Sequence, residues 1–340
     1  MILLWGAPGD APLDAVREAL ARRGAPAVLL DQRRSAQTSV TLRIGAQGRV
    51  CGEIEDPDGT LPLDQVRALY LRPVETPKAC GTDDPASAVY QRAAASDAAM
   101  VTWADVADAA VVNRPEAMAA NNSKPYQLAL IAAWGFAVPA TLVTTDVTAV
   151  RRFCRRHGSV IYKSVSGVRS IVSRLAATDE DALRNVANCP TQFQQYIPGT
   201  DVRVHVAGDA ILATEIRSAA DDYRYASRSG ADVAMVPLLL PDDVAEGCRA
   251  MAHDMKLRVA GIDLRRTPDG EWYCFEVNPS PGFTFFEAAT GQPIAAAIAE
   301  LLLQCERKAA FGVMADEGPA ASSGFSVPRR VAGDSLSAVS

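Results

Sequence analysis

The chain has 340 residues, of which 49% are hydrophobic and 22% are charged, and its formal net charge is −6. A chain of this length is too long for one small hydrophobic core and fits two or three compact units. The composition is that of a globular enzyme. The acidic balance argues against a dedicated nucleic-acid binder, and no apolar run approaches the roughly 18 residues of a membrane span.

The first 115 residues have the pattern of a small open α/β domain. An apolar strand, a helix with apolar positions at helical spacing and a second strand make a β-α-β opening. The predicted elements are a strand at 2–5, a helix at 12–23, a strand at 27–30, a hairpin over 40–54, a strand at 68–71, a helix at 86–109 and a strand at 111–113.

The rest of the chain predicts two mixed α+β units, 116–193 and 194–312, and a tail. The first unit should contain an N-cap-like start at 121–123 followed by a helix to 134, a strand at 138–143, a helix at 146–157, a strand at 160–163, a flexible loop at 164–170, a strand at 171–175 and a helix at 179–187. In the second unit strands dominate, joined by a helix at 241–256, a hairpin and a last helix at 293–307. Residues 313–340, rich in Ser, Gly, Ala and Pro, predict a disordered tail.

The cysteines and the first residues of the chain indicate the cellular compartment. The opening MILLWGAPGD lacks a basic region and contains Gly6 and Pro8, so it predicts a strand and turn rather than a signal peptide. The seven cysteines form no CxxC and only three histidines accompany them, which argues against a zinc site or a disulfide framework. We therefore expect a cytoplasmic protein with reduced thiols.

The strongest local signal is a predicted hairpin over residues 261–278. If Asp269-Gly270 is a two-residue turn, the register places Asp263 directly opposite Glu276, and Asn278 shares the face of Glu276. Opposed carboxylates repel unless a cation lies between them, and a set of oxygen ligands suits Mg²⁺. The alternative is a polar hairpin whose carboxylates meet arginines such as Arg265.

Lysines provide the second signal. Lys163 ends an apolar strand and precedes a small-residue loop that includes Ser166 and Gly167, whose backbone N–H groups could approach phosphates. Lys124, at the start of a helix, could add a second charge. No GxxxxGK[ST] is present, so this is not a Walker A loop. The alternative is that each lysine is a solvated surface residue.

The third signal is a strand at 201–206 that alternates strictly. Its valines predict a core face, and Arg203 and His205 share the other face. Arg217 lies with Glu215 on the next predicted strand. Arginines on adjacent strands could stabilise charge on a transferring phosphoryl group or a tetrahedral intermediate. A solvated sheet face is the alternative, and His205 alone favours a structural role.

In order and spacing, these segments resemble the ATP-grasp enzymes, especially the RimK-like branch of carboxylate–amine ligases. The matching segments are VVNRP at 111–115, SKPYQL at 123–128, VPAT at 138–141, IYK at 161–163, QQYIPG at 194–199, DVR at 201–203, GID at 261–263 and EVNP at 276–279. The likeness covers about residues 110 to 308. It implies a fold class of α/β and α+β, with a small N-terminal open α/β domain followed by the two-lobed ATP-grasp fold.

The resemblance also implies roles for the matching residues at the nucleotide. Lys124 and Lys163 would contact the phosphates of ATP. The hinge, whose backbone would meet adenine, consists of Gln194, Gln195, Tyr196 and Ile197. Gln195 stands where many relatives carry an acidic residue, a difference that contacts through the backbone should survive.

The resemblance implies further roles at the metal and at the acyl group. Magnesium would be held by Asp263, Glu276 and Asn278, and Mn²⁺ could substitute for it. Arg203 and Arg217 would face an acyl phosphate. Because every metal-ligand position is filled, the chain does not resemble an inactive relative.

Two shorter stretches resemble one sub-branch. LYLRP at 69–73 and DYR at 222–224 are similar to segments of peptide maturases that install ester or amide crosslinks in ribosomal peptides, the graspetide synthetases. The aromatic segment PGFTFF at 281–286 either shapes a substrate pocket or anchors the last helix.

The sequence is compatible with three functions. The first is an ATP- and Mg²⁺-dependent ligase that activates a carboxylate as an acyl phosphate and joins it to an amine, forming ADP and phosphate. The second is a maturase that uses an amine or hydroxyl nucleophile within a precursor peptide, and the third is a non-catalytic ATP-binding regulator. The expected partners are the carboxylate substrate and its nucleophile, with no nucleic acid and no membrane; a homodimer is left open.

Overall fold

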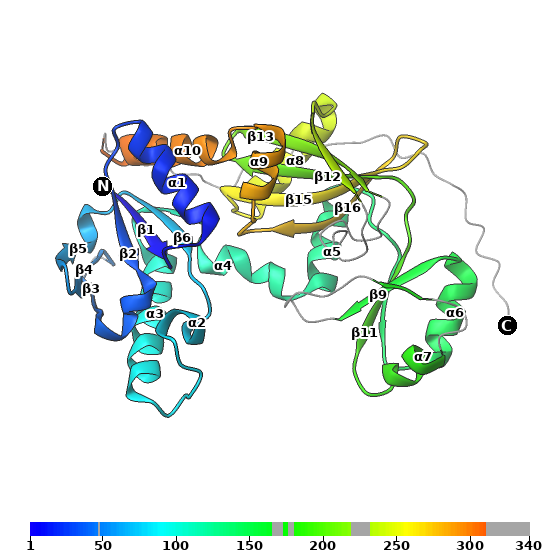
Figure 1. Ribbon diagram of the computed structural model, residues 1–340, viewed down its shortest axis with the longest axis horizontal. Helices are drawn as coiled ribbons and strands as arrows, with labels where there is room; N and C mark the ends of the chain where they lie inside the picture. The colour runs from blue at the N-terminus through cyan, green and yellow to red at the C-terminus, as the bar shows by residue number, and fades with distance from the viewer. Residues whose placement is uncertain (47, 165–172, 176–179, 219–231, 311–340) are drawn as a thin grey trace.

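The computed structural model describes residues 1–46, 48–164, 173–175, 180–218 and 232–310. Ser166 and Gly167, residues 222–224 and the predicted tail at 313–340 lie outside this part of the chain. Figure 1 shows a first domain in blue and cyan, a small green sheet with its helices, and a large sheet that runs from green to yellow. In the described residues no helix has both the length and the apolarity needed to cross a membrane.

The predicted β-α-β opening is confirmed in a parallel four-stranded sheet of order β2-β1-β6-β7. Its elements are β1 (Ile2–Gly6), α1 (Ala11–Arg22), β2 (Ala27–Asp31), η1 (Gln32–Gln37), β6 (Ala68–Arg72), α2 (Thr76–Cys80), α3 (Ala88–Val106) and β7 (Ala110–Val112). Ile2 and Leu4 pack toward α1, whereas Leu3 and Trp5 pack toward α3. Both faces are therefore covered, which explains why β1 is apolar throughout.

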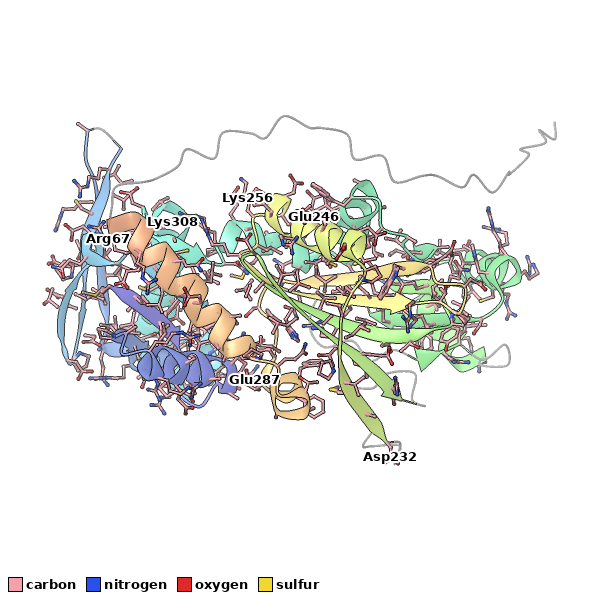
Figure 2. The ribbon with its side chains drawn as sticks, turned by 90° about the horizontal axis from the view of Figure 1, so that it is seen from above. Arg67, Asp232, Glu246, Lys256, Glu287 and Lys308 are labelled. Carbon is pink, nitrogen blue, oxygen red and sulfur yellow. The ribbon has the colours of Figure 1, made fainter. Side chains whose placement is uncertain are left out.

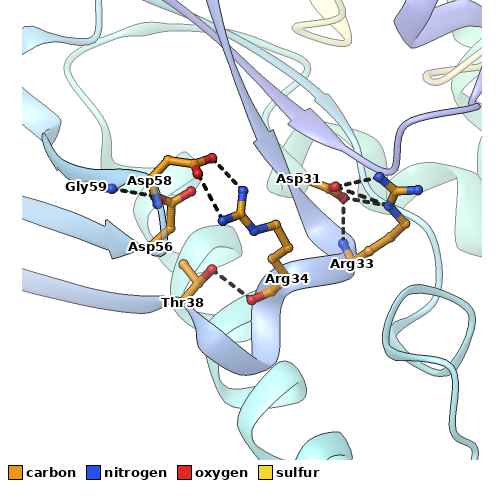
Figure 3. A network of polar contacts seen from close by, with 7 residues as sticks. All are labelled: Asp31, Arg33, Arg34, Thr38, Asp56, Asp58 and Gly59. Atoms are coloured by element: carbon orange, nitrogen blue, oxygen red, sulfur yellow. Dashed lines mark hydrogen bonds and ion pairs between the residues drawn. The ribbon is translucent and has the colours of Figure 1, made fainter.

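The predicted hairpin is confirmed and belongs to a separate three-stranded sheet. This sheet has the order β3-β4-β5, with β3 (Ser39–Ile44), β4 (Val50–Asp56) and β5 (Gly59–Pro62), followed by η2 (Leu63–Gln65). Figure 3 shows one of its contacts with η1, the ion pair of Arg34 with Asp58. At the start of η1, Asp31 accepts hydrogen bonds from the backbone and side chain of Arg33. Asp56 accepts the backbone N–H groups of residues 58 and 59, which shapes the β4–β5 turn.

A second, smaller unit contains an antiparallel sheet of order β10-β9-β11-β8. Its elements are α4 (Pro115–Met118), η3 (Ala119–Asn122), α5 (Lys124–Ala133), β8 (Thr141–Thr144), α6 (Val147–His157), β9 (Val160–Ser164), β10 (Ser173–Arg174), α7 (Glu180–Val186) and β11 (Thr191–Gln195). Helices α6 and α7 cover one face through contacts with Val160 and Phe193.

Of two predicted boundaries in this unit, one was wrong and one is confirmed. The strand expected at 138–143 begins at Thr141, because Pro139 has no N–H to donate to a neighbouring strand. The N-cap-like start predicted at 121–123 is confirmed, because α5 begins at Lys124 with Ser123 as its N-cap; a short 3-10 helix precedes it. Of the strand expected at 171–175, the structure describes only β10 and Leu175.

The large sheet is antiparallel with the order β14-β13-β12-β15-β16. Its elements are β12 (Thr200–Ala207), β13 (Ala210–Ser218), β14 (Val233–Leu238), α8 (Asp242–Asp254), β15 (Val259–Arg266), β16 (Trp272–Asn278), α9 (Thr284–Thr290) and α10 (Ile294–Ala310). Val202 and Val204 face the core that α5 and α8 complete, as the alternation predicts. Side chains of the opposite face are therefore available for chemistry.

The last helix connects the two ends of the chain. Ile298 and Leu302 of α10 pack in one core with Leu13 and Leu20 of α1, and Figure 1 shows the orange helix beside the blue one. Helix α10 thus contributes to the first domain as well as to the large sheet.

Candidate active site

The β15–β16 hairpin brings together the three predicted metal ligands. Asp263 pairs directly with Glu276, and Asn278 pairs with Gly261, so the three oxygen-bearing side chains lie on one face. Val277 points the other way and is fully buried. The predicted facing of Asp263 and Glu276 is confirmed.

The turn that produces this register differs from the predicted one. The turn contains three residues, 268–270, rather than two: the Thr267 N–H donates to Glu271 O (2.9 Å) and the Gly270 N–H donates to Thr267 O (3.0 Å). Gly270 has φ 86°, the left-handed conformation that ends such a loop. A bulge at Phe275 then shifts the register back, since Leu264 pairs with Cys274 whereas Asp263 pairs with Glu276.

Each carboxylate has a cation beside it. The Lys124 Nζ lies 3.5 Å from Glu276 Oε1, and the Arg203 Nη1 lies 2.6 Å from Asp263 Oδ1. The alternative named arginines such as Arg265, and for that residue it is wrong, because Arg265 pairs with Asp201 and donates to the Ile197 carbonyl (2.9 Å). The arginine that meets a carboxylate of the hairpin is Arg203.

The donor set fits a hard divalent cation. It consists of two carboxylates and one amide oxygen, the ligands that Mg²⁺ accepts while it keeps waters and phosphate oxygens. Asn278 Oδ1 also accepts the Ser280 N–H (3.0 Å), which fixes the amide without using both lone pairs. The described residues contain no cluster of three His, Cys, Asp or Glu side chains that could hold a metal ion.

Lys163 lies on the face of the small sheet that α6 and α7 do not cover. It pairs with Gln192 across β9 and β11, and Gln194 shares that face, whereas Phe193 points into the helical core. Lys163 is 9% exposed, so the expectation of a solvated surface lysine is wrong for this residue.

Gln192 is a candidate that the sequence reasoning missed. Its side chain is fully buried, and neither its Nε2 nor its Oε1 has a hydrogen-bond partner in the described part of the chain; the same holds for Gln194 Oε1. Buried polar atoms without partners are rare in native proteins, and a bound polar ligand is one explanation for them. The available signal was a glutamine two residues before Gln194, on the same face of the same strand. These orphaned atoms beside Lys163 fit a nucleotide.

Two backbone N–H groups of the predicted hinge form hydrogen bonds within the chain. The Gln195 N–H donates to Ala140 O and the Tyr196 N–H donates to Ser159 O, each at 2.9 Å. The Tyr196 ring lies 4.1 Å from the guanidinium carbon of Arg174 and 5.8 Å from that of Arg265. Contacts of this segment with adenine would therefore use backbone groups other than these two N–H groups.

The structure does not bring the two predicted arginines together. Arg203 pairs with Thr214, so Glu215 and Arg217 lie on the valine face of the sheet, opposite to Arg203. Arg217 forms an ion pair with Glu215 (2.7 Å) and its side chain is mostly exposed.

The face of Arg203 is not solvated. Arg203 and His205 are 6% and 2% exposed, and the His205 ring packs edge-to-face on Phe286 with 5.0 Å between centroids. Burial, helped by Arg203, lowers the pKa of His205 well below its usual value, so the ring is neutral at neutral pH. This supports the structural role expected for His205.

The first domain is attached directly to the loop that follows the hairpin. Arg72 donates to Ser280 Oγ and to the Pro281 carbonyl, both at 3.1 Å, and pairs with Asp10. Asn113 donates to the Pro279 carbonyl (2.6 Å) from the end of β7. Residues of the motifs at 69–73 and 111–115 thus contact the segment that follows Asn278, the last of the predicted metal ligands.

A cavity of about 620 Å³ lies away from these residues, between α8, α10 and the β12–β13 turn. Figure 2 shows two of its cations, Lys256 just after α8 and Lys308 near the end of α10. A third, Arg114, binds carbonyls at the end of α3, and cations at helix carboxyl ends balance the helix dipole. None of the predicted site residues lines this cavity, and we do not assign the nucleotide to it.

Comparison with known proteins agrees with this geometry. A family model described as the RimK-like ATP-grasp domain matches residues 121–302, more than half of the chain. A probable alpha-L-glutamate ligase of Photobacterium profundum is 30% identical over 209 residues, which are 58% of this chain and 68% of that protein.

Solved structures match over a longer stretch. The ATP-grasp ligase PsnB, complexed with a phosphomimetic variant of a minimal precursor, Mg and ADP, is 29% identical with a TM-score of 0.74, covering 90% of this chain and 98% of its own. The macrocyclase MdnC from Microcystis aeruginosa MRC, bound with precursor peptide MdnA, is 22% identical with a TM-score of 0.75, covering 89% and 100%, and shares the fold. This chain belongs to the RimK-like ATP-grasp family of ligases.

Proposed function

We propose that this ligase activates a carboxylate of a ribosomal precursor peptide and joins it to an amine or hydroxyl group of the same peptide. The observation that carries the reaction class is the β15–β16 hairpin, where Asp263, Glu276 and Asn278 share one face with Lys124 and Arg203 beside them. The likeness to PsnB, which extends through the first domain, supports the peptide substrate.

ATP with Mg²⁺, and by this proposal also with Mn²⁺, would supply the phosphoryl group that converts the carboxylate into an acyl phosphate. Asp263, Glu276 and Asn278 would hold the metal, and Lys124 and Lys163 would hold phosphate oxygens. The work of the chain is then mostly positioning and electrostatic stabilisation.

Arg203 is the side chain best placed to face developing negative charge. It is buried, it stays charged at any relevant pH, and Asp263 fixes its orientation. Neutral His205 beside it adds no second charge. The nucleophile attacks the activated acyl group, phosphate leaves and one proton is released from the amine or hydroxyl; we assign no general base for that proton among the described residues.

The test combines product release with mass spectrometry. Purified chain, ATP and Mg²⁺ are incubated with short peptides encoded near its gene that contain Asp or Glu together with Thr, Ser or Lys. We expect release of ADP and phosphate that depends on the peptide, and loss of one water from the peptide mass for each bond formed. ADP release with an unchanged peptide mass, or ATP binding without turnover, would contradict the proposal.

A second candidate is the addition of an amino acid to a peptide or protein end. It is favoured by the curated relatives, which are named probable alpha-L-glutamate ligases. In the same assay with free glutamate present, this activity would increase the mass of the acceptor by whole residues rather than decrease it. The sign of the mass change therefore decides between the two.

A further inference from the structure

Helix α5 presents two polar side chains, one turn apart, to the outer strand of the large sheet. Lys124 lies beside Glu276, and Gln127, which is 2% exposed, contacts the next residue, Val277. The Gln127 Nε2 donates to the Val277 carbonyl (2.7 Å), and the Val277 N–H donates to Gln127 Oε1 (3.0 Å). One amide thus satisfies both backbone groups of Val277.

Gln127 takes the place that a neighbouring strand would have at this edge of the sheet. Strand β16 is at the edge of the sheet, and Val277 is completely buried, so water cannot satisfy its outward-facing backbone groups. Leaving a buried N–H and a buried carbonyl unpaired is costly, and Gln127 provides the donor and the acceptor that a neighbouring strand would have provided.

The two bonds lie at a chemically important place. The Val277 N–H belongs to the peptide plane that follows Glu276, and the Val277 carbonyl belongs to the plane that precedes Asn278. Gln127 therefore holds both peptide planes between two of the proposed metal ligands. Other contacts hold the strand farther out, where the Cys274 N–H donates to Ala137 O (2.8 Å) and Asn113 donates to Pro279 O (2.6 Å).

We propose that Gln127 is a positioning residue for the divalent-metal site, which sets the direction of the Glu276 and Asn278 side chains by fixing the backbone between them. This inference rests on the proposed function, because it takes those two side chains as metal ligands. Groups that orient metal ligands without touching the metal typically matter roughly 10- to 100-fold for metal affinity.

The chain contains a matched control. Gln32, which is 1% exposed, donates to the Val74 carbonyl (2.9 Å) and accepts the Val74 N–H (2.8 Å), the same bidentate contact within the first domain. Gln32→Met and Gln127→Met both remove a two-bond contact with a valine backbone and keep side-chain length; Gln32→Met also removes a hydrogen bond from Gln32 Nε2 to Asp97 Oδ2 (3.0 Å). Both should lower the melting temperature, and only the second should affect the metal.

The test measures ADP binding by calorimetry, with and without Mg²⁺, in the full chain. For Gln127→Met we expect the strengthening of ADP binding by Mg²⁺ to require roughly 10- to 100-fold more metal, while binding of ADP alone is unchanged. Gln32→Met should keep the metal requirement of the natural chain. Hydrogen exchange should become faster within residues 272–278 of Gln127→Met and not within the same residues of Gln32→Met.

A milder variant covers the case in which Gln127→Met does not fold. Gln127→Asn keeps the amide but is one methylene shorter, so it cannot bridge both groups of Val277, and the metal requirement should shift in the same direction. A folded Gln127 variant that needs no more Mg²⁺ than the natural chain would overturn the inference. A variant whose ADP affinity falls equally with and without Mg²⁺ would also overturn it.

The two proposals fail in different ways. A natural chain that binds ADP in a Mg²⁺-dependent way but modifies no peptide would refute the proposed function and leave the role of Gln127 standing. If Mg²⁺ does not strengthen ADP binding to the natural chain at all, the metal site is wrong and both proposals fall.

Discussion

Arg203 and Asp263 face each other across β12 and β15, and their side chains form an ion pair with 2.6 Å between Nη1 and Oδ1. Arg203 is almost completely buried, whereas Asp263 is one-third exposed on the face of the proposed metal site. The pair gives the arginine a fixed orientation and leaves the carboxylate accessible to a cation.

The first prediction concerns this arginine. Arg203→Lys keeps the charge but loses the planar fork that pairs with Asp263, so turnover should fall about 10-fold or more in the ADP-release assay. Arg217→Lys, on the other face of the sheet, should show a smaller loss. The exposed Arg43→Lys in the first domain serves as the reference. Equal losses at Arg203 and Arg217 would contradict the assignment that the register implies.

Gly261 leaves the space that Arg203 occupies. A Cβ at this position would clash with Arg203 Nη2 and would lie 2.7 Å from the Pro281 Cβ. We therefore expect Gly261→Ala to displace the guanidinium and to reduce turnover nearly as much as Arg203→Lys. Gly270→Asn, in the hairpin turn, keeps a residue that tolerates a positive φ and should change turnover little. A fully active Gly261→Ala would show that the position of Arg203 is not critical.

Removal of metal ligands is the third prediction. Glu276→Gln and Asp263→Asn should each lower Mg²⁺-dependent turnover by about 100-fold, since each removes one charge that holds the cation. Glu271→Gln changes an exposed carboxylate of the same hairpin and should have little effect. Chelation should abolish turnover of the natural chain, and either Mg²⁺ or Mn²⁺ should restore it. Unchanged activity in Glu276→Gln would remove that residue from the ligand set.

Gln192 should show opposite effects on stability and binding. Because its buried amide has no partner in the described residues, Gln192→Leu should increase the free energy of unfolding by about 1 kcal/mol. The same change should weaken ADP binding if the amide contacts the nucleotide. Denaturant unfolding and calorimetry measure the two quantities, with the exposed Gln304→Leu as the control. A variant that is more stable and binds ADP normally would mean that Gln192 does not contact the nucleotide.

Much of the β15–β16 hairpin could be predicted from its residues, although one step was wrong. Period-two alternation places Glu276 and Asn278 on one face, and that property is local to a single strand. The pairing of Asp263 with Glu276 was also predicted, but from a two-residue turn. The three-residue turn and the bulge at Phe275 shift the register by one residue in opposite directions, so the predicted pair survives.

The arginines show where local patterns are insufficient. Arg203 and Arg217 lie on adjacent strands, and both were expected at the acyl phosphate. Their faces depend on the register between β12 and β13, and a shift of one residue moves a side chain to the other side of a sheet. The pairing of Arg203 with Thr214 settles this in the structure, and Arg217 lies on the valine face.

By itself, the sequence determined the order of most strands and helices, although not β5, α2 or α9, together with the buried faces of β1 and β12 and the residue types that a nucleotide and a divalent cation require. These properties depend on neighbours along the chain, through the periodicity of strands and helices. Only the tertiary structure decided that Arg203 meets Asp263, that Gln127 completes the edge of β16 and that Gln192 lacks a partner among the residues it describes. Each of these depends on which distant segments pack together, and that packing is set by burial and strand register over the whole chain.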